Sequence, residues 1–235
     1  MRRIILFAVA ALFINYAQAQ FKPVGKDFCI ELQFFPFGNP VIMATGDNYD
    51  VGGTNVPVFG ISPRFFLTEK MELKVDLQFS AFSTKNKVPV PAGGNGVEEV
   101  TVNSMGGFGL NFGLNYHFKG TERISPYVGA MFGFGIANTH TKVTGLNHVQ
   151  GDSRNDKAGT FGLGFDLVTG FNWYIVKGLY IGAEVDLGVG FAKPLKTSTS
   201  TTVGGVTNAN TVNPTSSRVA FAFTAGPALR LGWKF

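Results

Sequence analysis

The sequence predicts an all-β protein, specifically an eight-stranded antiparallel up-and-down transmembrane β-barrel. After residue 25, apolar and polar residues alternate through most of the chain. This period of two is typical of strands whose two faces meet different environments. Charged residues make up only 15% of the chain, compared with roughly 25% in soluble domains. No stretch approaches the ~20 apolar residues of a spanning helix, so we expect strands to cross the membrane.

The N-terminal segment has the three-part layout of a secretory signal. Arg2 and Arg3 give a positive start, residues 4–14 are apolar, and Ala17 and Ala19 fit a small-x-small cleavage pattern before Gln20. An uncleaved anchor is disfavoured, because the apolar run would form about 16 Å of helix, roughly half of a ~30 Å hydrocarbon core. We therefore predict a cleaved signal peptide at 1–19 and a single barrel domain at 20–235.

The first four predicted strands cover 26–36, 56–67, 71–83 and 101–118. Their apolar faces are formed, in order, by Phe28, Ile30, Leu32 and Phe34; by Phe59, Ile61, Phe65 and Leu67; by Met71, Leu73, Val75, Leu77, Phe79 and Ala81; and by Phe108, Leu110, Phe112, Leu114, Tyr116 and Phe118. The third segment shows the clearest alternation, since Glu72, Lys74, Asp76, Gln78 and Ser80 fill its other face.

The last four predicted strands cover 126–138, 159–174, 179–192 and 218–235. Their apolar faces are formed by Val128, Ala130, Phe132, Phe134 and Ile136; by Phe161, Leu163, Phe165, Leu167, Phe171 and Trp173; by Leu179, Ile181, Ala183, Val185, Leu187, Val189 and Phe191; and by Val219, Phe221, Phe223, Leu229, Leu231, Trp233 and Phe235. Each of the eight segments has the ~9–11 residues that a tilted strand needs to cross a bilayer.

The predicted connections alternate in length. Three are short, at about 68–70, 119–125 and 175–178. Four are expected to be long loops, at about 38–55, 84–100, 139–158 and 193–217, because they hold Gly, Asn, Asp, Thr and Pro. Short turns at one end and long loops at the other are typical of outer-membrane barrels, with the turns periplasmic. An even strand number then places both termini in the periplasm. The Ser- and Thr-rich segment 196–217 is expected to be a solvated loop, or alternatively a surface for an extracellular ligand.

The polar faces of the predicted strands distinguish a membrane barrel from a soluble one. They are rich in glycine, as at Gly162, Gly164, Gly188 and Gly190. Glycine weakens strands and is usually kept where space is tight, such as a narrow lumen. The many Phe, Leu, Ile and Val side chains would not fit inside eight strands. They are therefore expected to face lipid.

With this orientation, several charged residues point into the lumen. The expected set is Glu31, Arg64, Asp76, Asp166, Glu184, Asp186 and Arg230, with Glu72 and Lys74 also inward. Glu184, Arg230 and Glu31 should meet where the sheet closes. Paired charges are what a low-dielectric interior tolerates. Two interpretations remain: a structural network that plugs the lumen, or a salt-bridge plug that gates a small pore.

Aromatic residues gather at the turn ends of the predicted strands. Tyr116, Phe118, Phe171 and Trp173, with Trp233, are expected to form an interfacial girdle. General strand propensity of aromatic residues is the alternative explanation.

The chain ends on Leu229, Leu231, Trp233 and Phe235, alternating up to the last residue. Over 26–235 it resembles the small outer-membrane barrels of the OmpA/OmpX type, within the "outer membrane protein β-barrel domain" group common in Bacteroidetes. The resemblance implies a Gram-negative outer membrane, with its lipid and lipopolysaccharide as surroundings. It also implies that the C-terminal residues are an assembly signal read by the barrel assembly machinery, with periplasmic chaperones as further partners.

The composition argues against other function classes. The net charge is +5 and the basic residues are scattered, so we expect no nucleic-acid partner. Cys29 is the single cysteine, and His140 and His148 share one long connection. The Asp47, Asn48 and Asp50 cluster lacks the spacing of a calcium loop. We expect no metal and no cofactor.

We also expect no enzyme, because His117 has no evident serine or acid partners in the sequence. The predicted function is an envelope-stabilising barrel that displays loops and has a plugged lumen. The alternative is a narrow or gated porin-like channel for ions or small solutes.

Overall fold

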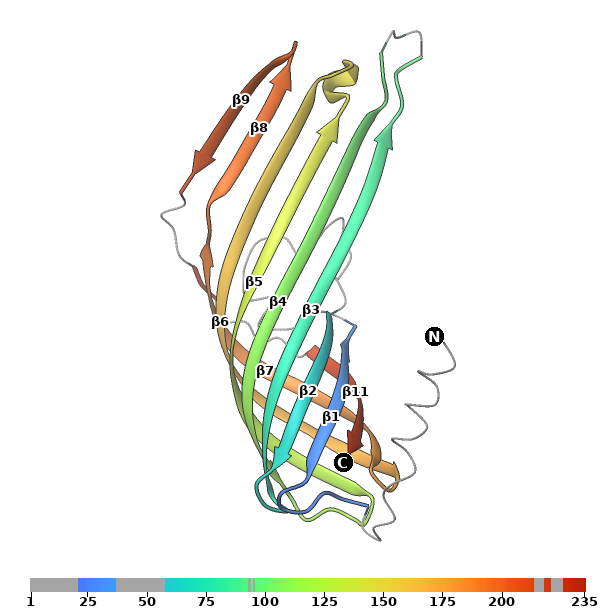
Figure 1. Cartoon of the computed structure of the whole chain (residues 1–235), viewed down its shortest axis with the longest axis vertical. Helices are drawn as coiled ribbons and strands as arrows, with labels where there is room; N and C mark the ends of the chain where they lie inside the picture. The colour runs from blue at the N-terminus through green and yellow to red at the C-terminus, as the bar shows by residue number, and fades with distance from the viewer. Residues whose placement is uncertain (1–20, 37–57, 93, 95, 214–217, 221–225) are drawn as a thin grey trace.

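The computed structural model (Figure 1) describes residues 21–36, 58–92, 94, 96–213, 218–220 and 226–235. The predicted signal peptide at 1–19 and the expected loop at 38–55, with Asp47, Asn48 and Asp50, lie outside the described residues. No helix in the described part of the chain has the length and apolar character needed to span a membrane.

The described secondary structure consists of strands and one short 3₁₀ turn, η1 (Leu146–His148). The strands are β1 (Phe28–Phe35), β2 (Val58–Phe66), β3 (Met71–Val88), β4 (Glu99–His117), β5 (Ile124–Thr144), β6 (Ser153–Val176), β7 (Leu179–Pro194), β8 (Thr197–Val203), β9 (Val206–Val212), β10 (Arg218–Ala220) and β11 (Gly226–Lys234).

Eight strand positions close into a ring. Strands β1 to β7 pair antiparallel in chain order, and β11 pairs with both β7 and β1. Strand β10 also pairs with β7, so that β10 and β11 together occupy the eighth position. Closure leaves no free edge around the ring, as lipid requires of a spanning sheet. The predicted eight-stranded antiparallel barrel is confirmed.

The alternation places polar residues inside and large apolar residues outside. On β3, the inward Glu72, Lys74 and Gln78 are buried, while the outward Leu73 and Phe79 are 42% and 46% exposed. This distribution is the reverse of that in a soluble protein, where buried charges are rare. The outer wall is therefore the lipid-facing surface, and the lumen holds the charges.

Glycines give the large inward side chains room on neighbouring strands. A Cβ atom at Gly232 on β11 would overlap the ring of Tyr180 on β7. A Cβ atom at Gly188 would overlap the Asp166 carboxylate on β6. The sequence prediction that glycines line a crowded lumen is consistent with both positions.

Three of the expected long loops are wrong in large part. Strands β3 and β4 continue to Val88 and from Glu99, β5 and β6 meet across 145–152, and β8 and β9 form a hairpin paired to the start of β6. The upper parts of β3, β4, β5 and β6, together with β8 and β9, form a sheet extension that rises beyond the ring (Figure 1). Strand β6 has 24 residues, or roughly 80 Å at ~3.3 Å per residue, far more than a ~30 Å hydrocarbon core requires.

The sheet extension escaped the sequence analysis because both of its faces are polar. Segment Thr197–Val203 reads TSTSTTV and Val206–Val212 reads VTNANTV. Thr and Val favour strands, but without an apolar face the period of two disappears from the hydropathy pattern. The Ser- and Thr-rich segment 196–217 is therefore a hairpin over most of its length and not an irregular loop.

Candidate functional site: the charged layer of the lumen

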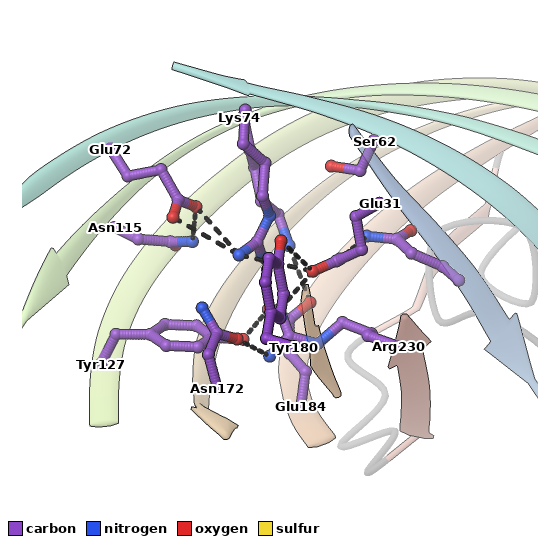
Figure 2. A network of polar contacts seen from close by, with 12 residues as sticks. Glu31, Ser62, Glu72, Lys74, Asn115, Tyr127, Asn172, Tyr180, Glu184 and Arg230 are labelled. Carbon is purple, nitrogen blue, oxygen red and sulfur yellow. Dashed lines mark hydrogen bonds and ion pairs between the residues drawn. The ribbon is translucent and has the colours of Figure 1, made fainter. Parts of the chain in front are cut away.

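Five barrel strands bring charged side chains to one level of the lumen, as Figure 2 shows for the residues it labels. We call this cluster the charged layer. Its ionisable members are Glu31 on β1, Arg64 on β2, Glu72, Lys74 and Asp76 on β3, Glu184 on β7 and Arg230 on β11. Each occupies an inward position of its strand, and closure of β11 against β1 brings the first and last strands of the ring together.

Two guanidinium groups alternate with carboxylates at the centre of the charged layer. Arg64 Nη1 lies 3.5 Å from Glu31 Oε2 and 3.4 Å from Glu72 Oε1. Arg230 Nη1 lies 3.5 Å from Glu31 Oε2 and 3.3 Å from Glu184 Oε2. Arg64 Nη2 is also 3.9 Å from Glu184 Oε2. Every carboxylate at this centre therefore has at least one guanidinium partner, which offsets the cost of removing it from water.

Lys74 extends the charged layer toward the sheet extension. Its Nζ donates to Glu184 Oε1 at 2.7 Å and lies 3.3 Å from Asp76 Oδ2. The other oxygen of Asp76 accepts hydrogen bonds from the Ser62 hydroxyl and, at 3.2 Å, from Gln33 Nε2. One ammonium thus joins two carboxylates on different strands.

Two tyrosines complete the charged layer. The Tyr180 hydroxyl donates to Glu31 Oε2 at 2.9 Å, and the Tyr127 hydroxyl donates to Glu184 Oε2. The Tyr127 ring also lies 5.0 Å from the Arg230 guanidinium carbon, within the range of a cation–π contact. The alternation of the sequence is consistent with both tyrosines facing inward, but it does not predict which carboxylates accept their hydrogen bonds.

The expectation that His117 has no serine or acid partner is wrong. His117 Nε2 is 2.9 Å from Glu72 Oε2, and its Nδ1 is 2.9 Å from Ser125 Oγ. The two nitrogens have the reverse order of a hydrolase triad, in which the serine bonds Nε2 and the acid bonds Nδ1. Ser125 and His117 are 6% and 2% exposed. The arrangement holds Glu72 beside Arg64, with Asn115 Nδ2 donating to Glu72 Oε1 at 2.9 Å.

The ion-paired side chains at the centre of the charged layer are fully buried. The side chains of Arg64, Glu31, Glu72, Glu184 and Arg230 are each 0% exposed in their ion pairs.

Asp166 and Asp186, expected in the same network, make no ion pair with it. No basic side chain of the described residues is within ion-pair distance of either. Asp166 Oδ2 and Asp186 Oδ1 are buried without a hydrogen-bond partner. The lumen thus contains a paired layer and, on β6 and β7, two carboxylates without cationic partners. Within the described chain, no group of three or more His, Cys, Asp or Glu side chains could hold a metal ion.

Four of the five predicted girdle residues are exposed at the turn end of the barrel, and Trp233 is half-buried. Tyr116, Phe118, Phe171 and Trp173 are 44–47% exposed. At the C-terminus, Leu229 and Leu231 face outward at 58% and 46% exposure. The backbone N–H of Phe235 donates to Phe28 O at 2.8 Å, so the last residue is tied to β1.

Several solved structures of outer-membrane proteins are similar to this chain. Among solved structures, the chain is similar to the N-terminal β-barrel domain of Pseudomonas aeruginosa OprF (14% identity, 91% of this chain and 100% of that chain, TM-score 0.36). It is also similar to OprG from Pseudomonas aeruginosa (14% identity, 92% and 99%, TM-score 0.45). A third similar structure is the outer membrane protein AlkL in DMPC bilayers (15% identity, 94% and 95%, TM-score 0.29).

No curated protein matches the sequence significantly. Residues 50–235, however, match the family described as "Putative OmpA-OmpF-like porin family". This match covers seven of the eight predicted strands and most of the charged layer. The closed ring with its lipid-facing apolar wall is the architecture that such a family requires. The chain is therefore an outer-membrane β-barrel and belongs to this OmpA-OmpF-like porin family.

Proposed function

We propose that this protein is a non-catalytic barrel that stabilises the cell envelope and displays its sheet extension outside the cell, with a lumen closed by the charged layer. The complete burial of the ion-paired Arg64, Glu72, Glu184 and Arg230 carries the proposal. An eight-stranded barrel has an interior just wide enough for side chains. Opening a path would separate several buried pairs at once, at a cost of several kcal/mol for each charge left alone.

Conductance in planar bilayers tests the closed lumen. We expect the wild-type protein to show no steady openings. The substitution Glu184→Gln removes the carboxylate shared by Arg64, Lys74 and Arg230, and in a closed structural barrel it leaves the trace silent. The control is Glu98→Gln, which removes an exposed carboxylate 3.0 Å from Lys87. Steady wild-type openings would overturn the proposal.

The second candidate function is a gated cation channel, which the unpaired carboxylates Asp166 and Asp186 favour. In this case Glu184→Gln loosens the charged layer and produces openings, while Glu98→Gln does not. Cations should then carry most of the current, because two uncompensated carboxylates repel anions. Replacing both Asp166 and Asp186 with Asn should reduce that cation preference.

The proposed orientation places the short turns in the periplasm and the sheet extension outside. Cys29 is the single cysteine and is buried, so a Cys29→Ser background allows clean labelling. A membrane-impermeant maleimide should label Gly205→Cys, in the β8–β9 turn, on intact cells. It should label Lys70→Cys, in the β2–β3 turn, only after the outer membrane is broken. The opposite labelling pattern would reverse the orientation.

The C-terminal residues Leu229, Leu231, Trp233 and Phe235 remain our proposed assembly signal, with the barrel assembly machinery and periplasmic chaperones as proposed partners. The position of Phe235 beside β1, with its ring centroid 6.0 Å from that of Phe28, supports a role at the closing seam.

A further inference from the structure

A sharp upper boundary ends the apolar band on the outer wall of β3–β6. Phe79, Phe108, Ile136 and Phe161 lie opposite one another in a single cross-strand row. Four residues further along the strands, the outward row contains Ser83, Ser104, His140 and Lys157. Four residues span ~13 Å of strand, or ~10 Å along the membrane normal at the usual tilt. The second row therefore lies close to the polar headgroup layer.

Four lysines gather on the outer wall around this boundary. Lys193 is paired with Phe161, Lys142 and Lys157 lie on β5 and β6, and Lys196 follows β7. All four are exposed. We call them, together with His140, the basic patch. It lies where β5, β6 and the β7–β8 connection run side by side (Figure 1).

A pocket of about 570 Å³ lies within the basic patch. Its lining includes Asn138, His140, Lys157, Gly159, Leu195 and Lys196. Gly159 lies at the centre of this lining: a Cβ atom there would be 3.0 Å from Asn138 Oδ1 and 3.3 Å from Leu195 Cδ1. The absence of a side chain at this position keeps the pocket open between two lysines and a histidine.

The lysine charges of the basic patch are not neutralised by the described protein. No described carboxylate is within ion-pair distance of Lys142, Lys157, Lys193 or Lys196. Glu98 is paired with Lys87, and Asp156 is paired with Arg154. The nearest partner of His140 is neutral, since its Nε2 lies 2.6 Å from Asn155 Oδ1. Positive charge thus accumulates directly above a lipid-facing apolar wall.

We propose that the basic patch binds the phosphate of a lipid headgroup whose acyl chains lie on the apolar wall below it. Lysine side chains at a membrane interface keep their stems on apolar surface and direct the ammonium to the headgroups. Each lysine near an anionic membrane surface contributes measurably to attraction. The apolar row at Ile136 and Phe161 distinguishes this occupant from a soluble anion, because it supplies the surface for the acyl chains.

Native mass spectrometry of the purified full-length protein in detergent tests the proposal with a defined probe. The probe is diphosphoryl lipid A, compared with the same lipid without its phosphates. The patch variant is Lys157→Gln, Lys193→Gln and Lys196→Gln combined. The matched control removes three exposed lysines from the turns at the other end of the barrel, Lys70→Gln, Lys119→Gln and Lys177→Gln.

We expect the patch variant to bind diphosphoryl lipid A at least about tenfold more weakly, since each interfacial lysine supports roughly fivefold in affinity. The control should bind as the wild type does, and the dephosphorylated lipid should not distinguish the variants. Heat-modifiable gel migration checks that each variant forms the barrel. Equal binding by patch and control variants would overturn the proposal. Complete displacement of the lipid by equimolar inorganic phosphate would overturn it too, by indicating a soluble-anion site.

The proposed orientation determines only which leaflet of the outer membrane supplies the lipid to the basic patch. Binding in detergent does not depend on sidedness or on conductance. If maleimide labelling reversed the orientation while the patch variant still lost lipid, the lipid site would stand and the proposed display of the sheet outside the cell would fail.

Discussion

Arg64 is the residue of the charged layer whose loss should destabilise the barrel strongly, because it neutralises three buried carboxylates. It lies within 4 Å of Glu31, Glu72 and Glu184 and is 0% exposed. Arg64→Ala should lower the free energy of unfolding by about 3–5 kcal/mol, because it leaves buried carboxylates without their partner. Denaturant titration in lipid, followed by loss of the heat-modifiable gel form, measures the change.

Arg154→Ala is the matched control for this prediction. Arg154 Nε lies 2.7 Å from Asp156 Oδ2, but its side chain is 52% exposed, so the loss should stay below about 1 kcal/mol. Equal losses for the two variants would mean that water reaches Arg64 and that the charged layer is not closed.

At the scale of single residues, the sequence predicted which side chains face the lumen but not which side chains they contact. The period of two placed Arg64, Glu184 and Arg230 inward because each follows the alternation of its strand. Lys74 and Glu184 are 110 positions apart, and their contact depends on how side chains cross a closed ring. The bonds from His117 to Ser125 and Glu72 depend on the same three-dimensional detail, so the sequence could not reveal them.

Packing between β7 and β11 makes Gly232 intolerant of a side chain. Gly232→Val should destabilise the barrel by about 1–3 kcal/mol, because its side chain would collide with Tyr180 and force that ring from Glu31. The control is Gly106→Val on β4, where an added Cβ has its nearest neighbour, Ser80 O, at 3.8 Å. The same unfolding titration compares them, and an unaffected Gly232→Val barrel would contradict the predicted collision.

The β8–β9 hairpin is attached only to the upper part of the barrel wall. Strand β8 pairs with β6 over Ser153–Lys157 and with β9, and neither pairing involves the ring below. Replacing Thr197–Val212 with a short Gly-Ser linker should therefore leave heat-modifiable migration unchanged. Proteolysis should become faster at the start of β6, which loses β8 and keeps only β5 as a neighbour. Failure of the shortened chain to form a barrel would show that the hairpin is needed for folding.

At the scale of elements, the sequence predicted the strand segments that face lipid and missed the strand segments of the sheet extension, which do not. Strands such as β3 and β7 have one apolar face, so alternation was visible over the membrane-spanning portion. Beyond Phe79 on β3 and Ile136 on β5 most residues on both faces are polar or small, with Phe82, Val88 and Val143 as exceptions, and the strands continue without the pattern. Turn-forming residues in these stretches therefore predict loops where the structure has strands.

The whole barrel depends on closure by its last strand. Strand β11 pairs with β7 from Gly226 to Trp233 and with β1 from Leu229 to Lys234. Deleting Trp233–Phe235 should reduce the folded, heat-modifiable fraction in outer-membrane preparations severalfold, since it removes pairing on both sides of the seam. A matched deletion of three residues from the β8–β9 hairpin should not. Normal assembly of the C-terminal deletion would argue against an assembly signal there.

At the scale of the whole molecule, the sequence predicted the ring and its inverted faces correctly. Counting the amphipathic segments gave the number of strands. The outward orientation of their apolar faces followed because a narrow lumen cannot hold so many large side chains. The sequence did not predict that β3–β6 are much longer than the described strands β1, β2 and β11. All of these strands have the same alternating pattern where they face lipid.

The unbroken ladder between β3 and β4 has a mechanical consequence. It runs in continuous register from Met71 opposite Tyr116 to Val88 opposite Glu99. A force applied to the distal end of this pair of strands is therefore transmitted along the ladder to the ring, because no break in register interrupts the pairing. Glu72 and Lys74 are on that same strand. A force that reaches the ring along β3 therefore acts on their ion pairs with Arg64 and Glu184.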